Sequence, residues 1–170
     1  VATVYAYDPA TDTWAERAPM PTARGALSVT GHDGKLYAIG GYDGKANSAA
    51  VEVYDPVRNL WASRAPLPTP RDHLATATVS GKVYAIGGRL NGDYHRNLAV
   101  TEEYDPVTDQ WKRATDLPTA RSGITASEVG GPGRLWRRCR LRATASGRLW
   151  CMGASTSSVA GRLPEAPSAI

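Results

Sequence analysis

One motif recurs along this chain with fixed internal spacing, and it constrains the fold more than any other feature. Tyr-Asp-Pro occurs three times, with a Trp seven residues after each Tyr and an Arg ten residues after each Trp. Successive motifs are separated by 47 and then 50 residues. The members are Tyr7, Tyr54 and Tyr104, then Trp14, Trp61 and Trp111, then Arg24, Arg71 and Arg121. Repeats of this length, rich in glycine and aromatic residues, indicate an array of similar units rather than one compact core.

Each repeat predicts four antiparallel strands joined by short turns. Asp33-Gly34 and Ser80-Gly81 supply the positive φ that a two-residue hairpin turn needs. The apolar runs that end at Gly40-Gly41 and Gly87-Gly88 predict central strands covered on both faces, and the paired glycines allow backbones to approach closely. We therefore predict an all-β structure of four-stranded antiparallel meanders. The expected strands are residues 25–30, 35–40, 51–55 and 61–64, then 72–80, 82–87, 101–105 and 111–113.

The order of Arg, paired glycines, Tyr-Asp-Pro and Trp resembles the kelch repeat, which forms one blade of a β-propeller. The resemblance covers residues 1 to about 129 and implies a ring of blades around a channel, of which this chain would form an open, unclosed arc. We expect residues 1–23 to be the C-terminal half of a blade, and residues 24–70 and 71–120 to be complete repeats. Because the chain starts in mid-blade, we expect a fragment, with the remaining blades of a parent chain as partners.

Residues 121–170 are expected to hold a partial or disrupted fourth repeat with an Arg-rich tail. The formal charge of +4 divides into −2 over residues 1–129 and +6 over residues 130–170. Two hypotheses explain the tail: a frameshift or assembly error from about residue 132, or a basic insertion after which the repeat resumes near Gly147. Because the basic charge lies outside the repeats, the sequence does not favour nucleic-acid binding. No apolar run approaches the roughly 18 residues of a membrane-spanning helix.

The recurring side chains have structural interpretations. A Trp at a fixed place in every repeat indicates packing between blades, and the Asp of Tyr-Asp-Pro is expected to accept hydrogen bonds from turn amides. The three arginines allow two interpretations: they bond loop carbonyls inside the fold, or they line the channel mouth. Cys139 and Cys151 lie in the tail without the further His or Cys that a zinc site would need. We expect no cofactor and no metal.

The resemblance implies a protein-binding face made of the loops after the paired glycines and the loops between Trp and Arg. The candidate binding residues are Arg24, Arg71, Arg121, Tyr42, Asp43, Asn47, His73, Arg89, Asn91, Tyr94 and His95. Because guanidinium groups bind carboxylates through two parallel hydrogen bonds, we expect a protein or peptide partner with an acidic segment. Arg71→Ala and Arg121→Ala are then expected to weaken binding and to leave the melting temperature nearly unchanged. The alternative is that these are ordinary solvated loops.

An enzyme is the alternative function, because galactose-oxidase-like copper enzymes and sialic acid epimerases are similar propellers. A copper-radical site of that kind requires a Cys joined to a Tyr and two His ligands. The repeats contain His32, His73 and His95 but no Cys. The sequence therefore favours a non-enzymatic scaffold without catalytic residues.

An open row of blades would also leave two broad apolar faces in contact with water, which natural monomers rarely do. We therefore expect the chain alone to be marginally stable or to self-associate.

Overall fold

The structure, a computed structural model, describes residues 1–128, 140–141 and 151–152. The chain divides into two units, residues 1–134 and 135–170. All the regular secondary structure within the described residues is β-strand. The second unit contains β11 (Arg140–Leu141) and β12 (Cys151–Met152), which pair in antiparallel fashion. The fourth-repeat prediction falls mainly outside the described residues.

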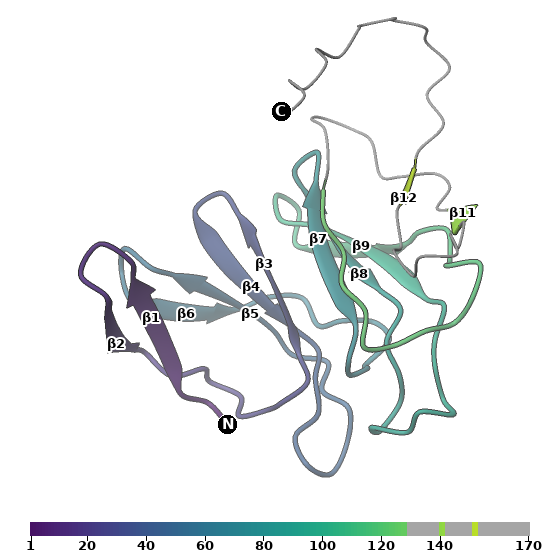
Figure 1. Ribbon diagram of the computed structural model, residues 1–170, viewed down its shortest axis with the longest axis horizontal. Helices are drawn as coiled ribbons and strands as arrows, with labels where there is room; N and C mark the ends of the chain where they lie inside the picture. Colours follow the sequence, from purple (N-terminus) through teal and green to yellow (C-terminus); the bar gives the residue numbers. More distant parts are fainter. Residues whose placement is uncertain (129–139, 142–150, 153–170) are drawn as a thin grey trace, which may run out of the picture. The chain divides into compact units, whose positions relative to one another are not determined.

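Two four-stranded antiparallel sheets and one hairpin make up the first unit (Figure 1). The first sheet contains β3 (Ser28–His32), β4 (Lys35–Ile39), β5 (Val51–Asp55) and β6 (Leu60–Ser63). The second contains β7 (Ala75–Val79), β8 (Lys82–Ile86), β9 (Thr101–Asp105) and β10 (Gln110–Arg113). The hairpin joins β1 (Val4–Asp8) to β2 (Thr13–Arg17). Each sheet follows sequence order, so the predicted all-β meanders are confirmed, and they do not close into a ring.

The first strand of each four-stranded sheet, β3 or β7, begins later than the sequence predicts. Strands were expected from residues 25 and 72, but β3 begins at Ser28 and β7 at Ala75. The residues before them, Ala26 and His73, take left-handed backbone conformations with φ of 52° and 50°. In this conformation His73 donates its N–H to the carbonyl of Ala26 at 2.9 Å. The backbone at this point therefore bonds to the neighbouring repeat instead of extending its own sheet.

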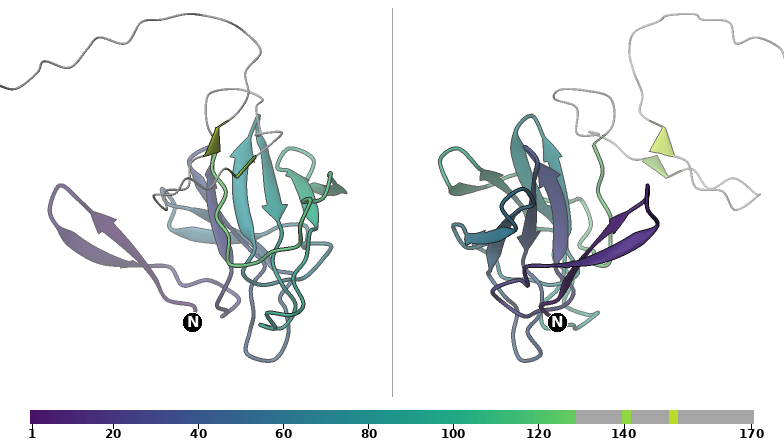
Figure 2. Two further views of the ribbon diagram at one scale, coloured as in Figure 1. Left: turned by 45° about the vertical axis from the view of Figure 1, so that its right-hand side comes forward. Right: turned by 90° about the vertical axis from the view of Figure 1, so that its left-hand side faces the viewer.

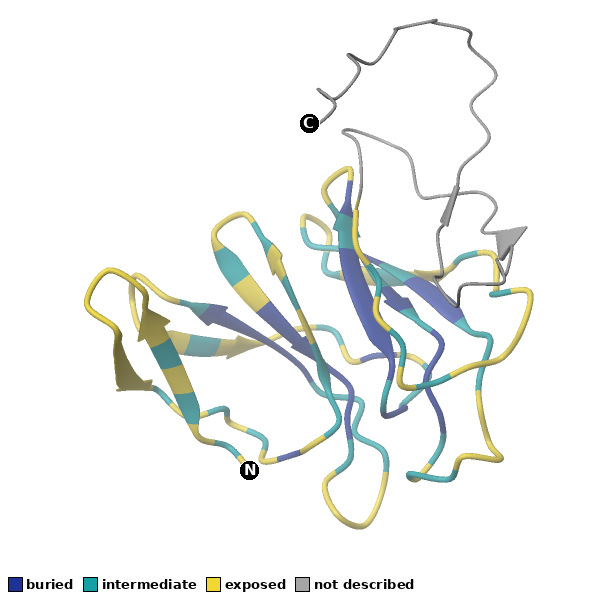
Figure 3. Ribbon diagram, viewed as in Figure 1, coloured by how far each residue is buried: buried dark blue, intermediate teal, exposed yellow. Residues whose placement is uncertain are grey.

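The hydrophobic core lies between the two sheets. Its buried members are Tyr37, Ile39, Val51, Val53, Leu67, Leu74, Val83, Ala85 and Tyr104. Buried residues are concentrated in the two complete sheets, whereas β1 and β2 are exposed or half-buried (Figure 3). The core is thus an interface between repeats, because the facing sides of the two sheets cover each other.

Close backbone contacts at the paired glycines join each sheet to the segment that begins the next repeat. Gly41 donates its N–H to the carbonyl of Arg71 at 2.9 Å, and Gly88 donates to Arg121 at the same distance. A Cβ added to Gly40 would lie 2.7 Å from the carbonyl oxygen of Arg71. The predicted close approach at these glycines is confirmed.

The recurring Trp and Asp residues have the structural roles expected of them. Trp61 donates its indole N–H to the carbonyl of Ala18, in the linker that follows β2, at 2.8 Å. Trp111 does the same with Ala65 at 2.9 Å. The carboxylates of Asp8, Asp55 and Asp105 accept hydrogen bonds from turn amides of Ala10, Val57 and Val107. Contacts between repeats are therefore confirmed for Trp61 and Trp111, whereas Trp14 is 69% exposed, and capping of turns by Asp is confirmed.

The loops and the hairpin turns lie at opposite ends of the two sheets. In the two views of Figure 2, the loops after the paired glycines, residues 41–48 and 89–97, extend from one end. The turns at residues 33–34 and 80–81 lie at the other end. Candidate binding residues from both loops therefore gather on a single side of the molecule.

Candidate functional site

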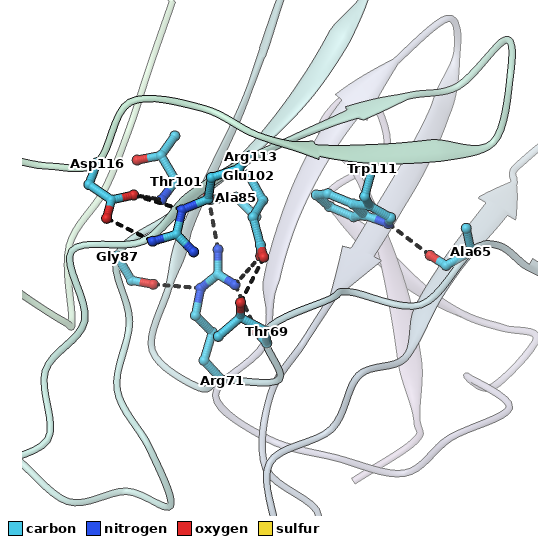
Figure 4. A network of polar contacts seen from close by, with 10 residues as sticks. All are labelled: Ala65, Thr69, Arg71, Ala85, Gly87, Thr101, Glu102, Trp111, Arg113 and Asp116. Carbon is cyan, nitrogen blue, oxygen red and sulfur yellow. Dashed lines mark hydrogen bonds and ion pairs between the residues drawn. The ribbon is translucent and has the colours of Figure 1, made fainter.

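Arg24 and Arg71 lie inside the fold. Arg71 is fully buried and donates to the carbonyls of Gly87 at 2.7 Å, Thr69 at 2.7 Å and Ala85 at 2.9 Å. Its Nη1 also forms an ion pair with Glu102 Oε2 at 2.5 Å (Figure 4). Burial lowers the pKa of Arg71, and the bond and charge of Glu102 oppose that shift. Each of the three guanidinium nitrogens therefore makes at least one hydrogen bond inside the fold.

Arg24 repeats the same arrangement in the first sheet. It is 1% exposed, bonds the carbonyls of Gly40, Thr22 and Ala38, and pairs with Glu52. The expectation that Arg24 and Arg71 face a ligand at the channel mouth is therefore wrong, and the alternative, that they bond loop carbonyls, is confirmed for these two. The physical reason is that each Arg reaches across its own sheet to a Glu that satisfies its charge.

Arg121 differs from the other two arginines because it is exposed. Within the described residues its guanidinium makes one hydrogen bond, to the carbonyl of Thr119 at 3.3 Å. The next residue, Ser122, donates to Asn97 at 2.7 Å and so places Arg121 beside the loop of residues 89–97. Of the three predicted arginines, Arg121 alone has its charge on the surface.

A buried carboxylate, Asp72, connects the two loops. Its Oδ2 accepts hydrogen bonds from Asn47 Nδ2 at 2.6 Å and from the backbone N–H of Gly92 at 2.8 Å. Its Oδ1 faces His73 Nδ1 at 2.6 Å and Arg89 Nε at 3.2 Å. Burial raises the pKa of Asp72, but these four bonds outweigh burial and hold the pKa below its usual value. Asp72 is therefore an ionised anchor for both loops.

The ring of His73 is held on both nitrogens. Its Nε2 lies 2.8 Å from Arg89 Nη2, and a guanidinium can only donate. Nε2 therefore accepts, and Nδ1 donates to Asp72. An imidazole in this arrangement has no lone pair left to take a proton from a substrate. The geometry serves to position the loops rather than to act as a general base.

Arg89 is buried under Tyr94, the most exposed aromatic residue of the second loop. The guanidinium carbon lies 3.8 Å from the centroid of the Tyr94 ring, and the tyrosine remains 73% exposed. This cation–π contact fixes one face of the ring and leaves the other to solvent. Arg89 is thus a support for Tyr94 and not a free cation.

The remaining predicted residues lie around this cluster or at its edge. Asn91 donates its N–H to Asn47 Oδ1 at 2.7 Å, which joins the two loops a second time. Tyr42 exchanges backbone hydrogen bonds with Gly25 at 2.8 and 2.9 Å. Asp43 closes its own turn, where the amides of Ala46 and Lys45 lower its pKa. His95 is exposed at the end of the second loop.

Asp72 was missed by the sequence analysis, although a signal for it exists. Gly25 and Ser122 follow Arg24 and Arg121, so the residue after the repeated Arg is small in two of the three copies. In the middle copy it is an acid. A charged residue that replaces small ones at a position beside a buried Arg requires donors nearby, and Asn47 and Arg89 supply them.

A second polar region lies on the innermost strands. Residues 29–33, 76–78 and 126–128 surround an open hollow of about 570 Å³. Its hydroxyl groups bond across the two sheets, Ser28 to Thr76 at 2.8 Å and Thr30 to Thr78 at 3.2 Å. His32 borders this hollow rather than the loops. These hydroxyl pairs join the first strands of the two sheets along one side of the hollow.

Within the described residues, no group of three or more His, Cys, Asp and Glu side chains could hold a metal ion. In the same part of the chain, no helix is long and apolar enough to cross a membrane.

Comparisons with known proteins agree with the geometry. The family model described as "Kelch motif" matches residues 23–68 and 70–118, over half of the chain. Kelch-like protein 1 of Mus musculus is 51% identical over 39 residues, and Kelch-like protein 5 of Homo sapiens is 52% identical over 40 residues. These stretches cover 23% and 24% of this chain and 5% of each relative. The structure of YjhT has the same fold, with a TM-score of 0.53 and 20% identity over 62% of this chain and 31% of that one.

Proposed function

Because the chain belongs to the kelch-motif family, we propose that it is a non-enzymatic scaffold that binds a protein segment on its loops. The binding surface, called the loop surface below, consists of residues 42–47 and 89–96. Propellers place variable loops at one end of a rigid framework, where substitutions do not disturb the strands. Since the chain spans only 5% of each curated relative, the proposal concerns this surface and not a whole protein.

The observation that supports binding is the Asp72 network. Asp72, Asn47 and Arg89 hold both loops in one arrangement before any partner arrives. A surface ordered in advance loses less conformational entropy on association than mobile loops would. The network also presents Tyr94 with one ring face open, and tyrosine is enriched among residues that dominate binding energy.

The enzyme alternative gains no support from these residues. Both nitrogens of His73 are engaged, and His32 borders the hollow on the inner strands, apart from the loops. In the described part of the chain, no three His, Cys, Asp or Glu side chains come together to hold the copper of a galactose-oxidase-like centre.

The acidic partner is a narrower proposal than protein binding. It was expected from three exposed arginines, of which Arg121 alone is on the surface. Lys45 and Arg96 add exposed positive charge to the loop surface, whereas Asp43 adds an exposed negative one. A partner with one or two acidic residues fits this balance better than a strongly acidic peptide.

Selection of ligands from a random peptide library on the whole chain tests the proposal. Selected peptides should bind Tyr94→Ala at least about tenfold more weakly, because the variant removes the exposed ring without touching Asp72. Val107→Ala, at an exposed turn outside the loop surface, is the matched control and should bind normally. If the peptides bind Tyr94→Ala and His95→Ala as tightly as the original chain, the loop surface is not the site.

A further inference from the structure

One hydrogen bond, between His73 and Arg89, joins the Asp72 network to the exposed part of the loop surface. His73 Nε2 accepts from Arg89 Nη2 at 2.8 Å, and within the described residues Nη2 makes no other hydrogen bond. The guanidinium of Arg89 lies under the ring of Tyr94, 3.8 Å from its centroid. The support of the exposed Tyr94 ring therefore depends on an imidazole whose Nε2 carries no proton.

A proton on His73 Nε2 is incompatible with this bond. An imidazolium carries an N–H on both ring nitrogens, and a guanidinium can only donate. Two donors, each part of a positively charged group, would then face each other across a distance that now holds a hydrogen bond. Arg89 is only 4% exposed, so water screens little of this repulsion. Protonation of His73 must therefore separate its ring from Arg89.

Two charged groups contact the ring of His73 within the described residues. Asp72, from the same segment, faces Nδ1 at 2.6 Å and favours the imidazolium, whereas Arg89, from the loop of residues 89–97, opposes it. The neighbouring segments contribute uncharged backbone groups, the carbonyl of Ala26 and the N–H of Gly123. Asp72 itself stays ionised near neutral pH, because its four hydrogen bonds outweigh burial and hold its pKa below the usual value. His73 is thus the group in this cluster that can change its charge.

The surroundings of His73 allow the ring to respond while the backbone stays in place. Its N–H donates to Ala26 at 2.9 Å, and its carbonyl accepts from Gly123 at 2.8 Å. The side chain is 38% exposed, so water can deliver a proton and can solvate the ring when it turns outward. The change therefore falls on the side chains of His73 and Arg89.

We propose that His73 is a pH switch for the loop surface, in which protonation of its ring releases Arg89 and loosens the Tyr94 loop. At neutral pH the uncharged ring holds Arg89 under Tyr94. At acidic pH Nη2 of Arg89 loses its acceptor, and the Tyr94 ring loses its fixed support. This regulation rests on the binding role proposed above: a ligand that requires the ordered loop favours the uncharged imidazole, so its affinity falls as the pH falls.

Nuclear magnetic resonance of the whole chain without ligand tests the switch itself. The pH is lowered from about 8 to about 5, the range in which histidine usually titrates. The ring of His73 should gain a proton, and the Overhauser contacts between the side chains of Arg89 and Tyr94 should weaken with the same midpoint. His73→Gln offers a carbonyl oxygen to Arg89 but cannot take up a proton, so its contacts should not change over this range. His32→Gln, which removes a histidine beside the hollow, is the matched control and should respond like the original chain.

A peptide without histidine, selected at pH 8 from the random library, tests the consequence for binding. Its affinity should fall about fivefold or more between pH 8 and pH 5 for the original chain and for His32→Gln. For His73→Gln the affinity should change little. Circular dichroism establishes that both variants keep their β-structure, and the measurement on the original chain stands even if His73→Gln does not fold.

Three results would overturn the switch. The Arg89–Tyr94 contacts could persist after His73 gains its proton, His73 could keep one protonation state from pH 8 to pH 5, or the affinity could fall equally in His73→Gln. If the contacts respond to pH as expected but the library yields no peptide that binds the loop surface, the switch stands and the proposed binding role fails. The two inferences are therefore tested separately.

Discussion

At the scale of single residues, the repeated arginine shows how one sequence position can have different roles in different repeats. Arg24 and Arg71 each bond three carbonyls and one glutamate, and all of these partners are buried or half-buried. Arg121 is exposed, with one bond in the described part of the chain. In the two repeats that the structure describes completely, a Glu of the same repeat therefore neutralises the buried Arg.

Arg71→Ala should destabilise the fold by about 3–5 kcal/mol, because it leaves the buried carboxylate of Glu102 without its partner. This reverses the expectation from sequence that the substitution leaves the melting temperature unchanged. Arg71→Lys keeps the charge, but its three donors sit on one nitrogen and cannot reproduce the bonds that the planar guanidinium makes from three. Its stability should therefore lie between those of the original chain and Arg71→Ala. Arg121→Ala is the matched control and should change stability by less than about 0.5 kcal/mol. Urea unfolding of all three measures the difference, and equal stabilities would contradict the buried role of Arg71.

At the scale of elements, each central strand ends in a glycine that permits the next repeat to approach. Gly40 follows β4 with φ of 67°, and the carbonyl of Arg71 lies 2.7 Å from where its Cβ would be. Gly34, in the β3–β4 turn, has φ of 68° but no atom within 4 Å of the same position. Both glycines therefore need a positive φ, but only at Gly40 would a Cβ contact neighbouring atoms.

Gly34→Ala should cost about 1 kcal/mol, the penalty of a left-handed conformation for a residue with a Cβ. Gly40→Ala adds a clash with backbone that cannot move away without separating the two sheets, so its cost should exceed about 3 kcal/mol. Thermal unfolding followed by circular dichroism compares the pair. Equal melting temperatures for the two variants would show that the close approach at Gly40 does not matter.

At the scale of the whole molecule, tyrosines from both sheets make the free energy of unfolding depend on pH in the alkaline range. Burial raises the pKa of Tyr37 and Tyr104 in the core. Burial, together with the bond to Glu103, raises the pKa of Tyr84 to about 12. These phenols keep their protons in the folded state at a pH where the unfolded chain loses them. Their contribution is therefore complete below pH 10 and declines as the pH rises toward 12.

The free energy of unfolding should accordingly fall as the pH is raised from 10 toward 12. Tyr84→Phe should be less stable near neutral pH, because Glu103 loses one hydrogen bond, and its decline with pH should be shallower. Urea unfolding at a series of pH values, with tyrosinate absorbance recorded in parallel, measures both effects. Tyr42→Phe is the control, and a decline with the same slope in Tyr84→Phe would refute the role of this tyrosine.

The strands that depend on local chemistry could be predicted from the amino-acid sequence. Each strand is marked by features a few residues apart: an apolar run, an Asp-Gly or Ser-Gly turn, or a Tyr-Asp-Pro motif at its end. The strands β5 and β9 have the predicted bounds. The family membership followed from the same spacing. These features can be predicted from the sequence because each depends on residues that are adjacent in the chain.

The roles of the polar residues depend on how the repeats pack together, so they could not be predicted from local sequence. Glu52 and Glu102 lie 28 and 31 residues from the arginines they neutralise, and no local pattern pairs them. Asp72 gathers donors from two loops that meet only when neighbouring repeats pack together. The left-handed residues Ala26 and His73 are likewise fixed by bonds between repeats, so β3 and β7 begin later than expected. Burial of a charge is a property of the packed array, and the packed array decides which charges remain on the surface for a partner.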